Sequence, residues 1–181
     1  MNTYIALFHG INVGGKNIIK TKELVSLLET LGAKQVKTYI QSGNVILEST
    51  NDPSRLSEQI SQAIQQRFGF APRVLVIDQA EFEKAIAENP FPEAISNPSS
   101  LHLEFLAHPA EHPNLDELDR IKSASEQYHL AERVFYLYAP EGIGRSKLAA
   151  NSEKLLEVPM TDRNWNTVMK IFEKANSKEN K

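Results

Sequence analysis

Short apolar runs alternate with segments of helical apolar spacing along the first half of the chain. The apolar residues Leu24, Leu28 and Leu31 share one face of a helix, and Asp52-Pro53 is a typical start for a second helix. The pattern predicts, in order, a strand over 4–9, a helix over 21–32, strands over 36–40 and 44–47, a helix over 53–69 and a strand over 74–77. This βαββαβ order predicts a four-stranded antiparallel sheet with both helices on one face.

The second half of the chain partly repeats this pattern. It predicts a strand over 101–107, a helix over 115–121, strands over 128–130 and 134–138, and helices over 147–156 and 165–175. No apolar run suggests a last strand, so we predict a degenerate second copy with an extra C-terminal helix. The predicted fold class is therefore α+β, with two α/β-plait (ferredoxin-like) subdomains.

The predicted boundary between the subdomains lies where helical and strand patterns both stop. Residues 89–100 hold three prolines and two asparagines among small and polar residues. We predict a first subdomain over 1–88, a linker over 89–100 and a second subdomain over 101–181.

The amino-acid composition excludes several kinds of site and argues against some classes of partner. The chain has 181 residues and no cysteine, which excludes disulfides, thiolate zinc sites and cysteine nucleophiles. The net charge of −3 offers no large positive field and argues against a nucleic-acid partner. No apolar run reaches the roughly 20 residues of a membrane span, and residues 4–8 are too few for a signal peptide. We predict a cytoplasmic protein with no membrane partner.

A glycine-rich loop over 10–17 directly follows the first predicted strand. Its glycines allow backbone amides to turn toward phosphate or carboxylate, and Lys16 adds a charge. The loop nearly matches the nucleotide-binding pattern G-x-x-x-x-G-K-[ST], with Asp78 after an apolar strand as the magnesium ligand. However, Asn17 replaces the hydroxyl residue, and residues 18–20 delay the helix. A tight surface connection explains the same glycines.

Three further polar clusters occur over 41–44, 142–147 and 161–167. A Ser-Gly hairpin turn explains part of the first, and the central strands lack the aromatic residues that stack RNA bases. The second places glycines and cations before a helix, which is a geometry that accepts anions. In the third, Arg163 and Asn164 lie at the start of a helix, although such a polar stripe is also typical of a solvated face.

Other catalytic patterns are weak. His108 and His112 have helical spacing, but the prolines that follow them prevent the helix, so we predict no metal and no cofactor. No Ser-His-Asp arrangement is visible. If turnover occurs, the available chemistry is electrostatic stabilisation, with Lys16 or His9 as proton-transfer groups, and whether the protein is an enzyme stays open.

At these clusters the sequence resembles the bacterial family known as domain of unknown function 1697 (DUF1697). The matching stretches are 6–17, 39–45, 142–148 and 161–168. The resemblance implies a duplicated α/β-plait architecture and implies no reaction. The family usually has arginine before the first glycine, where this chain has His9, and neutral histidine is a poor replacement for a guanidinium that binds phosphate.

From these observations we expect a binding site for a small anionic or phosphorylated ligand, in a cleft where the four segments meet between the two subdomains. The expected ligand-binding residues are Asn12, Gly14, Gly15, Lys16, Gln41, Asn44, Gly144, Arg145, Lys147, Arg163 and Asn164. Two alternatives stay open: a nucleotide-dependent phosphotransferase that uses the loop from Gly10 to Lys16, and a non-enzymatic module that contacts RNA or protein. The sequence does not predict the oligomeric state.

Overall fold

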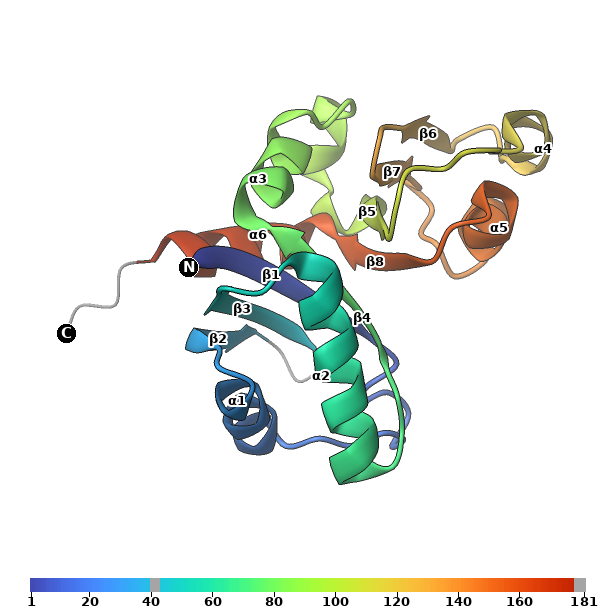
Figure 1. Cartoon of the computed structure of the whole chain (residues 1–181). Helices are drawn as coiled ribbons and strands as arrows, with labels where there is room; N and C mark the ends of the chain where they lie inside the picture. Colours follow the sequence, from blue (N-terminus) through green and yellow to red (C-terminus); the bar gives the residue numbers. More distant parts are fainter. Residues whose placement is uncertain (40–42, 178–181) are drawn as a thin grey trace. The chain divides into compact units, whose positions relative to one another are not determined.

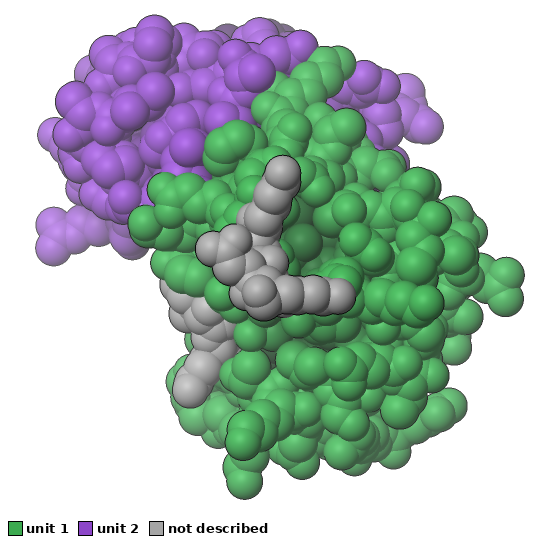
Figure 2. All heavy atoms as spheres, turned by 90° about the vertical axis from the view of Figure 1, so that its left-hand side faces the viewer, with its two compact units in different colours: residues 1–84, 170–181 green, residues 85–169 purple. Residues whose placement is uncertain are grey.

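The computed structural model describes residues 1–39 and 43–177. The chain divides into two compact units, which Figure 2 colours separately. Unit 1 comprises residues 1–84 and 170–181, and unit 2 comprises residues 85–169. Each unit contains one four-stranded sheet, so each is described by itself.

Unit 1 is built on an antiparallel sheet with the strand order β2-β3-β1-β4. Its elements are β1 (Asn2–His9), α1 (Thr21–Thr30), β2 (Lys34–Tyr39), β3 (Asn44–Ser49), α2 (Pro53–Phe68), β4 (Arg73–Asp78) and the first part of α3 (Gln79–Ala87). Helices α1 and α2 cover the same side of this sheet (Figure 1). The predicted βαββαβ order is therefore confirmed for this half of the chain.

The core of unit 1 between the helices and the sheet is almost entirely apolar. Tyr4, Ala6 and Phe8 of β1 face it, and the buried residues of α2 are Leu56, Ile60 and Ile64. Their i, i+4, i+8 spacing gives the helix one continuous apolar stripe. The predicted ends of α2 are also confirmed: Asp52 accepts a hydrogen bond from the Arg55 amide, and Gly69 adopts a left-handed φ of 83°.

Unit 2 has a second antiparallel sheet with the order β6-β7-β5-β8. Its elements are the 3₁₀ turns η1 (Pro92–Ser96) and η2 (Pro98–Ser100), β5 (Leu101–Leu106), α4 (Leu115–Ile121), β6 (Gln127–Leu130), β7 (Val134–Tyr138), α5 (Lys147–Leu156), β8 (Met160–Asn164) and the start of α6 (Trp165–Asn176). Leu148 and Leu156 of α5 pack with Leu106 and Phe135 in the core of the unit.

The prediction that the second half lacks a last strand is wrong. Strand β8 runs antiparallel to β5, with Glu104 opposite Asp162. Its sequence, Met-Thr-Asp-Arg-Asn, contains no apolar alternation, because its side chains on the core side are partly polar. Strand patterning depends on an apolar core face, so a strand that faces a polar part of the core gives no signal.

At the level of fold class the prediction is confirmed: the protein is α+β, with two four-stranded antiparallel sheets and six α-helices in the described part of the chain. The compact units differ in extent from the predicted subdomains. One boundary lies inside α3, and the end of α6 belongs to unit 1. Within residues 1–39 and 43–177, no helix is long and apolar enough to cross a membrane.

Candidate functional site

Three of the predicted ligand-binding residues line one pocket in unit 2. Gly144, Arg145 and Lys147 form one wall of a cavity of about 810 Å³. The other lining residues are Ile121, Ser123, Glu126, Glu141, Gly142 and Ser146. The pocket is thus built from the loop before α5, the first residue of α5, the last residue of α4 and the segment between α4 and β6.

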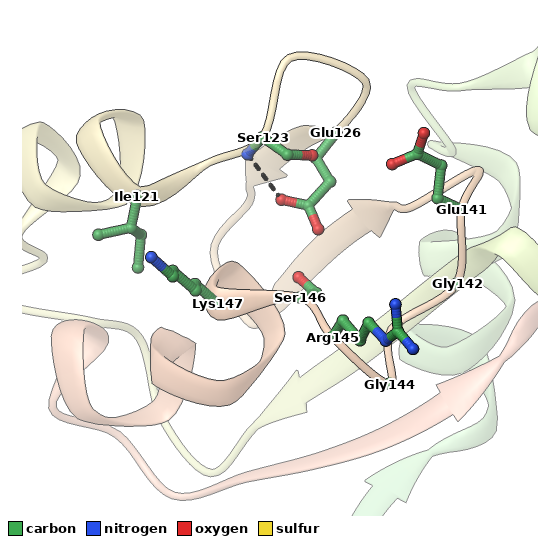
Figure 3. A pocket seen from close by; sticks show the side chains of 9 residues that line it. All are labelled: Ile121, Ser123, Glu126, Glu141, Gly142, Gly144, Arg145, Ser146 and Lys147. Atoms are coloured by element: carbon green, nitrogen blue, oxygen red, sulfur yellow. Dashed lines mark hydrogen bonds between the residues drawn. The ribbon is translucent and has the colours of Figure 1, made fainter.

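The pocket carries both signs of charge. Figure 3 shows the Lys147 side chain extending toward Ile121, and the guanidinium of Arg145 on the other side of the Glu126 carboxylate. Arg145 and Lys147 are exposed, whereas Glu126 is buried, with 5% of its surface exposed. The backbone amide of Ser123 donates to a Glu126 oxygen at 3.0 Å, which fixes this carboxylate in place.

The start of α5 contributes a positive dipole end to the same pocket. Ser146 is the N-cap of this ten-residue helix, and its hydroxyl oxygen accepts a hydrogen bond from the Ala149 amide at 3.0 Å. Ser146 is buried and holds the first turn, so the backbone that bears Arg145 and Lys147 has a defined direction. Helix starts of this kind attract anionic groups.

In unit 1, the glycine-rich loop is closed by its own polar groups. The Asn12 amide donates to the carbonyl of Asn17 at 3.1 Å, and the Lys16 amide donates to the carbonyl of Val13 at 3.1 Å. Gly14 and Gly15 have positive φ angles of 59° and 73° and, with Lys16, form an exposed turn. Two backbone amides of the loop are therefore used inside the loop itself.

This loop lacks the second half of a nucleotide-binding P-loop. In a P-loop the helix begins at the lysine, so that its N-terminal amides surround the phosphates. Here α1 begins at Thr21, after Lys16, and β1 and β4 are antiparallel. The geometry gives no support to a phosphotransferase that uses the loop from Gly10 to Lys16.

Asn12 and Asn44 do come together, at a small internal cavity of unit 1. Both line a space of only about 10 Å³, which is about the volume that one water requires. The Asn12 side chain accepts from the amide of Ile19 at 2.8 Å and donates to its carbonyl at 3.1 Å. Asn44 donates to the carbonyl of Tyr39 at 3.1 Å. The structure thus shows the Asn12 amide bonded within the loop and the Asn44 amide bonded to the neighbouring strand β2. Gln41 lies outside the described residues.

Arg163 and Asn164 lie at the end of β8 and do not line the pocket of unit 2. Asn164 accepts a hydrogen bond from the Thr167 amide at 3.0 Å and so caps α6. The Arg163 guanidinium donates to the carbonyl of Asp162 at 2.7 Å. Burial lowers the pKa of Arg163 to about 10, against the opposing effect of the Asp162 carboxylate, so this side chain is still cationic at neutral pH.

Sequence reasoning did not identify Glu126, Ser123 or Glu141 as parts of a site. Glu126 lies in a polar stretch where a carboxylate normally faces solvent, and only its burial distinguishes it. A weak signal existed: the segment 123–126 separates a helix from a strand, and such loops commonly carry binding residues. Within the described parts of the chain, no group of three or more side chains could hold a metal ion.

Comparisons with known proteins agree with this architecture. The structure is similar to that of the conserved bacterial protein SP0830 from Streptococcus pneumoniae, with a TM-score of 0.72 and 24% sequence identity. The similarity covers 98% of this chain and 99% of that chain, and at this identity it shows the fold alone. No curated protein matches.

A family model described as "Protein of unknown function (DUF1697)" matches residues 1–136. The match includes the glycine-rich loop and the hairpin around Asn44, whereas the segments over 142–148 and 161–168 lie beyond it. It covers well over half of the chain. The chain therefore belongs to the DUF1697 family of proteins of unknown function.

Proposed function

We propose that the protein binds a small ligand with a phosphate or carboxylate group in the pocket before α5 of unit 2. The observation that carries this proposal is the convergence of Arg145, Lys147 and the capped start of α5 on one cavity of about 810 Å³. A volume of this size is in the range of small-molecule sites. The two cations would neutralise the anionic group, and the helix start would add directed amides.

The carboxylates of the pocket indicate which chemical groups the ligand carries besides its anionic group. Glu126 is held by the Ser123 amide, and Glu141 accepts a hydrogen bond from the Ser125 hydroxyl at 3.2 Å. Carboxylates repel a ligand that is anionic throughout, but they accept hydrogen bonds from hydroxyl or ammonium groups. A ligand that carries an anionic group together with hydroxyl or amino groups, such as a sugar phosphate or a phosphorylated amine, fits this arrangement best.

The test is a binding screen by thermal shift and calorimetry with inorganic phosphate, sugar phosphates and phosphorylated amines. The variant Arg145→Ala/Lys147→Ala removes both cations, and Lys154→Ala serves as the matched control. Lys154 is an exposed cation of the same helix and does not line this pocket. We expect a ligand that stabilises the wild type and the control but not the double variant.

Two results would contradict the proposal. One is a wild type that responds to none of these ligands, which would favour the module that contacts RNA or protein. The other is a double variant that binds as tightly as the wild type, since the ligand would then occupy another surface. The prediction that Lys16 and Arg163 belong to the same site stays a prediction, and their alanine variants in the same screen test it.

We further propose that each unit is an α/β-plait subdomain. The support for this is that both sheets are antiparallel and share one pattern of strand order, β2-β3-β1-β4 and β6-β7-β5-β8. In each, the first strand of the unit lies between the third and the fourth. An experimental structure of residues 85–169 within the full chain tests this assignment, because a different connection between β7 and β8 would contradict it.

A further inference from the structure

A cluster of polar side chains lies between α5 and the sheet of unit 2, with three of them buried and the fourth, Asp162, 38% exposed at its side chain. The Ser152 Oγ and Glu104 Oε2 atoms are 2.8 Å apart and share a hydrogen bond. Nδ1 of His102 lies 3.0 Å and 3.1 Å from the two carboxylate oxygens of Asp162. His102, Glu104 and Ser152 are all buried, with 6%, 5% and 1% of their surfaces exposed. We call these four residues the polar cluster.

The polar cluster occupies the centre of the face that the helices cover. His102 and Glu104 lie on the same face of β5 as the core residue Leu106, and Asp162 lies opposite Glu104 on β8. Ser152 stands between Leu148 and Leu156 on the buried face of α5. The hydrogen bond from Ser152 to Glu104 therefore joins the helix to the sheet between the apolar residues of α5, and the Met160 amide of β8 adds a second link by donating to Glu153 of α5 at 3.3 Å.

Groups on β8, α5 and β7 disfavour a negative charge on Glu104. Asp162 on β8 and Glu153 on α5 repel a second negative charge, and β7 places Phe135 opposite Glu104. Burial, then the Asp162 charge, raises the pKa of Glu104 to about 8, although the Ser152 hydrogen bond opposes this. Arg163 follows Asp162 in β8, and its charge acts on Asp162. His102 adds a positive charge only when it is protonated.

A proton on Glu104 also completes the hydrogen bonds of Ser152. The Ser152 Oγ lies 3.2 Å from the carbonyl of Ala149, as well as 2.8 Å from Glu104. A hydroxyl has one hydrogen to donate. If Glu104 is protonated, it can donate to Ser152, which then donates to Ala149. If Glu104 is ionised, Ser152 must give its hydrogen to Glu104, and the contact with Ala149 is lost.

We infer that the polar cluster is a proton-dependent latch in the layer between α5 and the second sheet: the layer is stable while Glu104 carries its proton, and the buried negative charge destabilises the layer when the proton leaves. The inference goes beyond ligand binding and does not depend on it. It also differs from a catalytic role, because Ser152 and Glu104 are buried and do not line the pocket before α5. The latch makes the stability of unit 2 fall as the pH rises from about 4.5 to about 8.

The direction of the effect follows from proton binding. In the unfolded chain Glu104 has the ordinary pKa of 4.5, whereas in the folded protein the pKa is about 8. Between these two values the folded state binds more protons than the unfolded state, so rising pH favours unfolding. The stabilising contribution is full below about pH 4.5, falls across this interval and is lost above about pH 8.

The experiment is equilibrium unfolding of the full chain between about pH 5.5 and about pH 8.5, followed by tryptophan fluorescence. Trp165, the one tryptophan of the chain, is buried in unit 2 and reports on this unit. In the wild type we expect the folding equilibrium constant to fall over this range by about 100-fold more than in Glu104→Gln. The glutamine keeps the shape and accepts the Ser152 hydrogen bond, but it cannot ionise.

Glu132→Gln is the control, because Glu132 is an exposed glutamate of the same unit. It should follow the wild-type pH dependence. The latch is disproved if Glu104→Gln loses as much stability between about pH 5.5 and about pH 8.5 as the wild type does, or if the wild type loses none. If Glu104→Gln does not fold, the variant Asp162→Asn provides the test. Loss of the Asp162 charge lowers the pKa of Glu104, so the loss of stability must occur at lower pH than in the wild type. A pH dependence equal to that of the wild type contradicts the inference.

Discussion

The two units use the same helix-on-sheet layer but fill its centre with opposite chemistry. In unit 1 the buried stripe of α2 is Leu56, Ile60 and Ile64. In unit 2 the buried stripe of α5 is Leu148, Ser152 and Leu156, with a serine at the middle position. The strands that these helices cover differ in the same way, since Ala6 of β1 faces an apolar core whereas Glu104 of β5 faces Ser152.

This difference shows that one arrangement of strands and helices can have either apolar or polar side chains at its centre. An apolar centre is stabilised by burial alone. A polar centre needs complete hydrogen bonding, and it makes the fold depend on protonation. The polar centre lies in the unit that also has the charged pocket before α5, and both involve this helix: its start lines the pocket, and Ser152 in its middle bonds to Glu104.

The largest expected effect comes from giving unit 1 the polar residue of unit 2. Ile60→Ser removes a fully buried side chain and places a hydroxyl among the apolar residues of this core. We expect a loss of about 4 kcal/mol in the free energy of unfolding, from the cavity and the poorly satisfied hydroxyl. Chemical denaturation followed by circular dichroism measures it. Glu58→Ser, at an exposed position of α2, should change stability by less than about 0.5 kcal/mol.

The glycines of the two units provide a second contrast. Gly43 has a φ of 87°, and a Cβ added there would lie 2.5 Å from the Cβ of Phe8. A Cβ at Gly144 would meet nothing within 4 Å. We expect Gly43→Ala to cost about 3 kcal/mol and Gly144→Ala less than about 0.5 kcal/mol, measured by denaturation. Equal losses for the two variants would show that Gly43 is not confined by this contact.

Removing the Ser152 hydroxyl of α5 should reduce the free energy of unfolding by less than the two changes in unit 1. Ser152→Ala removes the hydroxyl from Glu104, and we expect a loss of about 1–2 kcal/mol near neutral pH. The Ser152 hydrogen bond lowers the pKa of Glu104, so its removal should also shift the pH-dependent loss of stability to higher pH. Denaturation at several pH values measures both. An unshifted pH dependence would show that Ser152 does not act on Glu104.

The smallest expected effect on stability concerns the pocket. Arg145 is exposed, so Arg145→Ala should change the free energy of unfolding by less than about 0.5 kcal/mol. It should nevertheless weaken the response to phosphorylated ligands by about tenfold, because it removes a charged hydrogen-bond donor. Calorimetry with the ligand found in the screen measures this. A variant that is unstable but binds normally would reverse the assignment of Arg145 to ligand contact.

Sequence patterns predicted most of unit 1 because its strands and helices have apolar faces. The N-cap Asp52 and the terminal Gly69 of α2 were both recognisable. Strand β8 was missed because its core face contains Asp162 in place of an apolar residue. A polar side chain in an apolar layer cannot be recognised until its partner is known, and Glu104 and Ser152 are 48 positions apart.

The candidate site was partly predictable for the same reason. Glycines and cations before a helix mark the start of α5, and Gly144, Arg145 and Lys147 do line one pocket. The residues that face them come from the segment between α4 and β6, which only the fold brings near. Asn12 and Asn164 were predicted as ligand contacts from their polarity, and the structure shows them bonding to the Ile19 and Thr167 backbones. Local sequence does not distinguish an amide that binds a ligand from one that holds a turn or caps a helix.

The most direct test of the polar centre in unit 2 is a pH titration of the glutamate side-chain carboxyl carbons by ¹³C NMR. We expect one carboxyl carbon of the wild type, that of Glu104, to titrate near pH 8 and to be missing from the spectrum of Glu104→Gln. If every glutamate of the wild type titrates close to the ordinary pKa of 4.5, Glu104 carries a charge at neutral pH. The proton-dependent latch would then be contradicted.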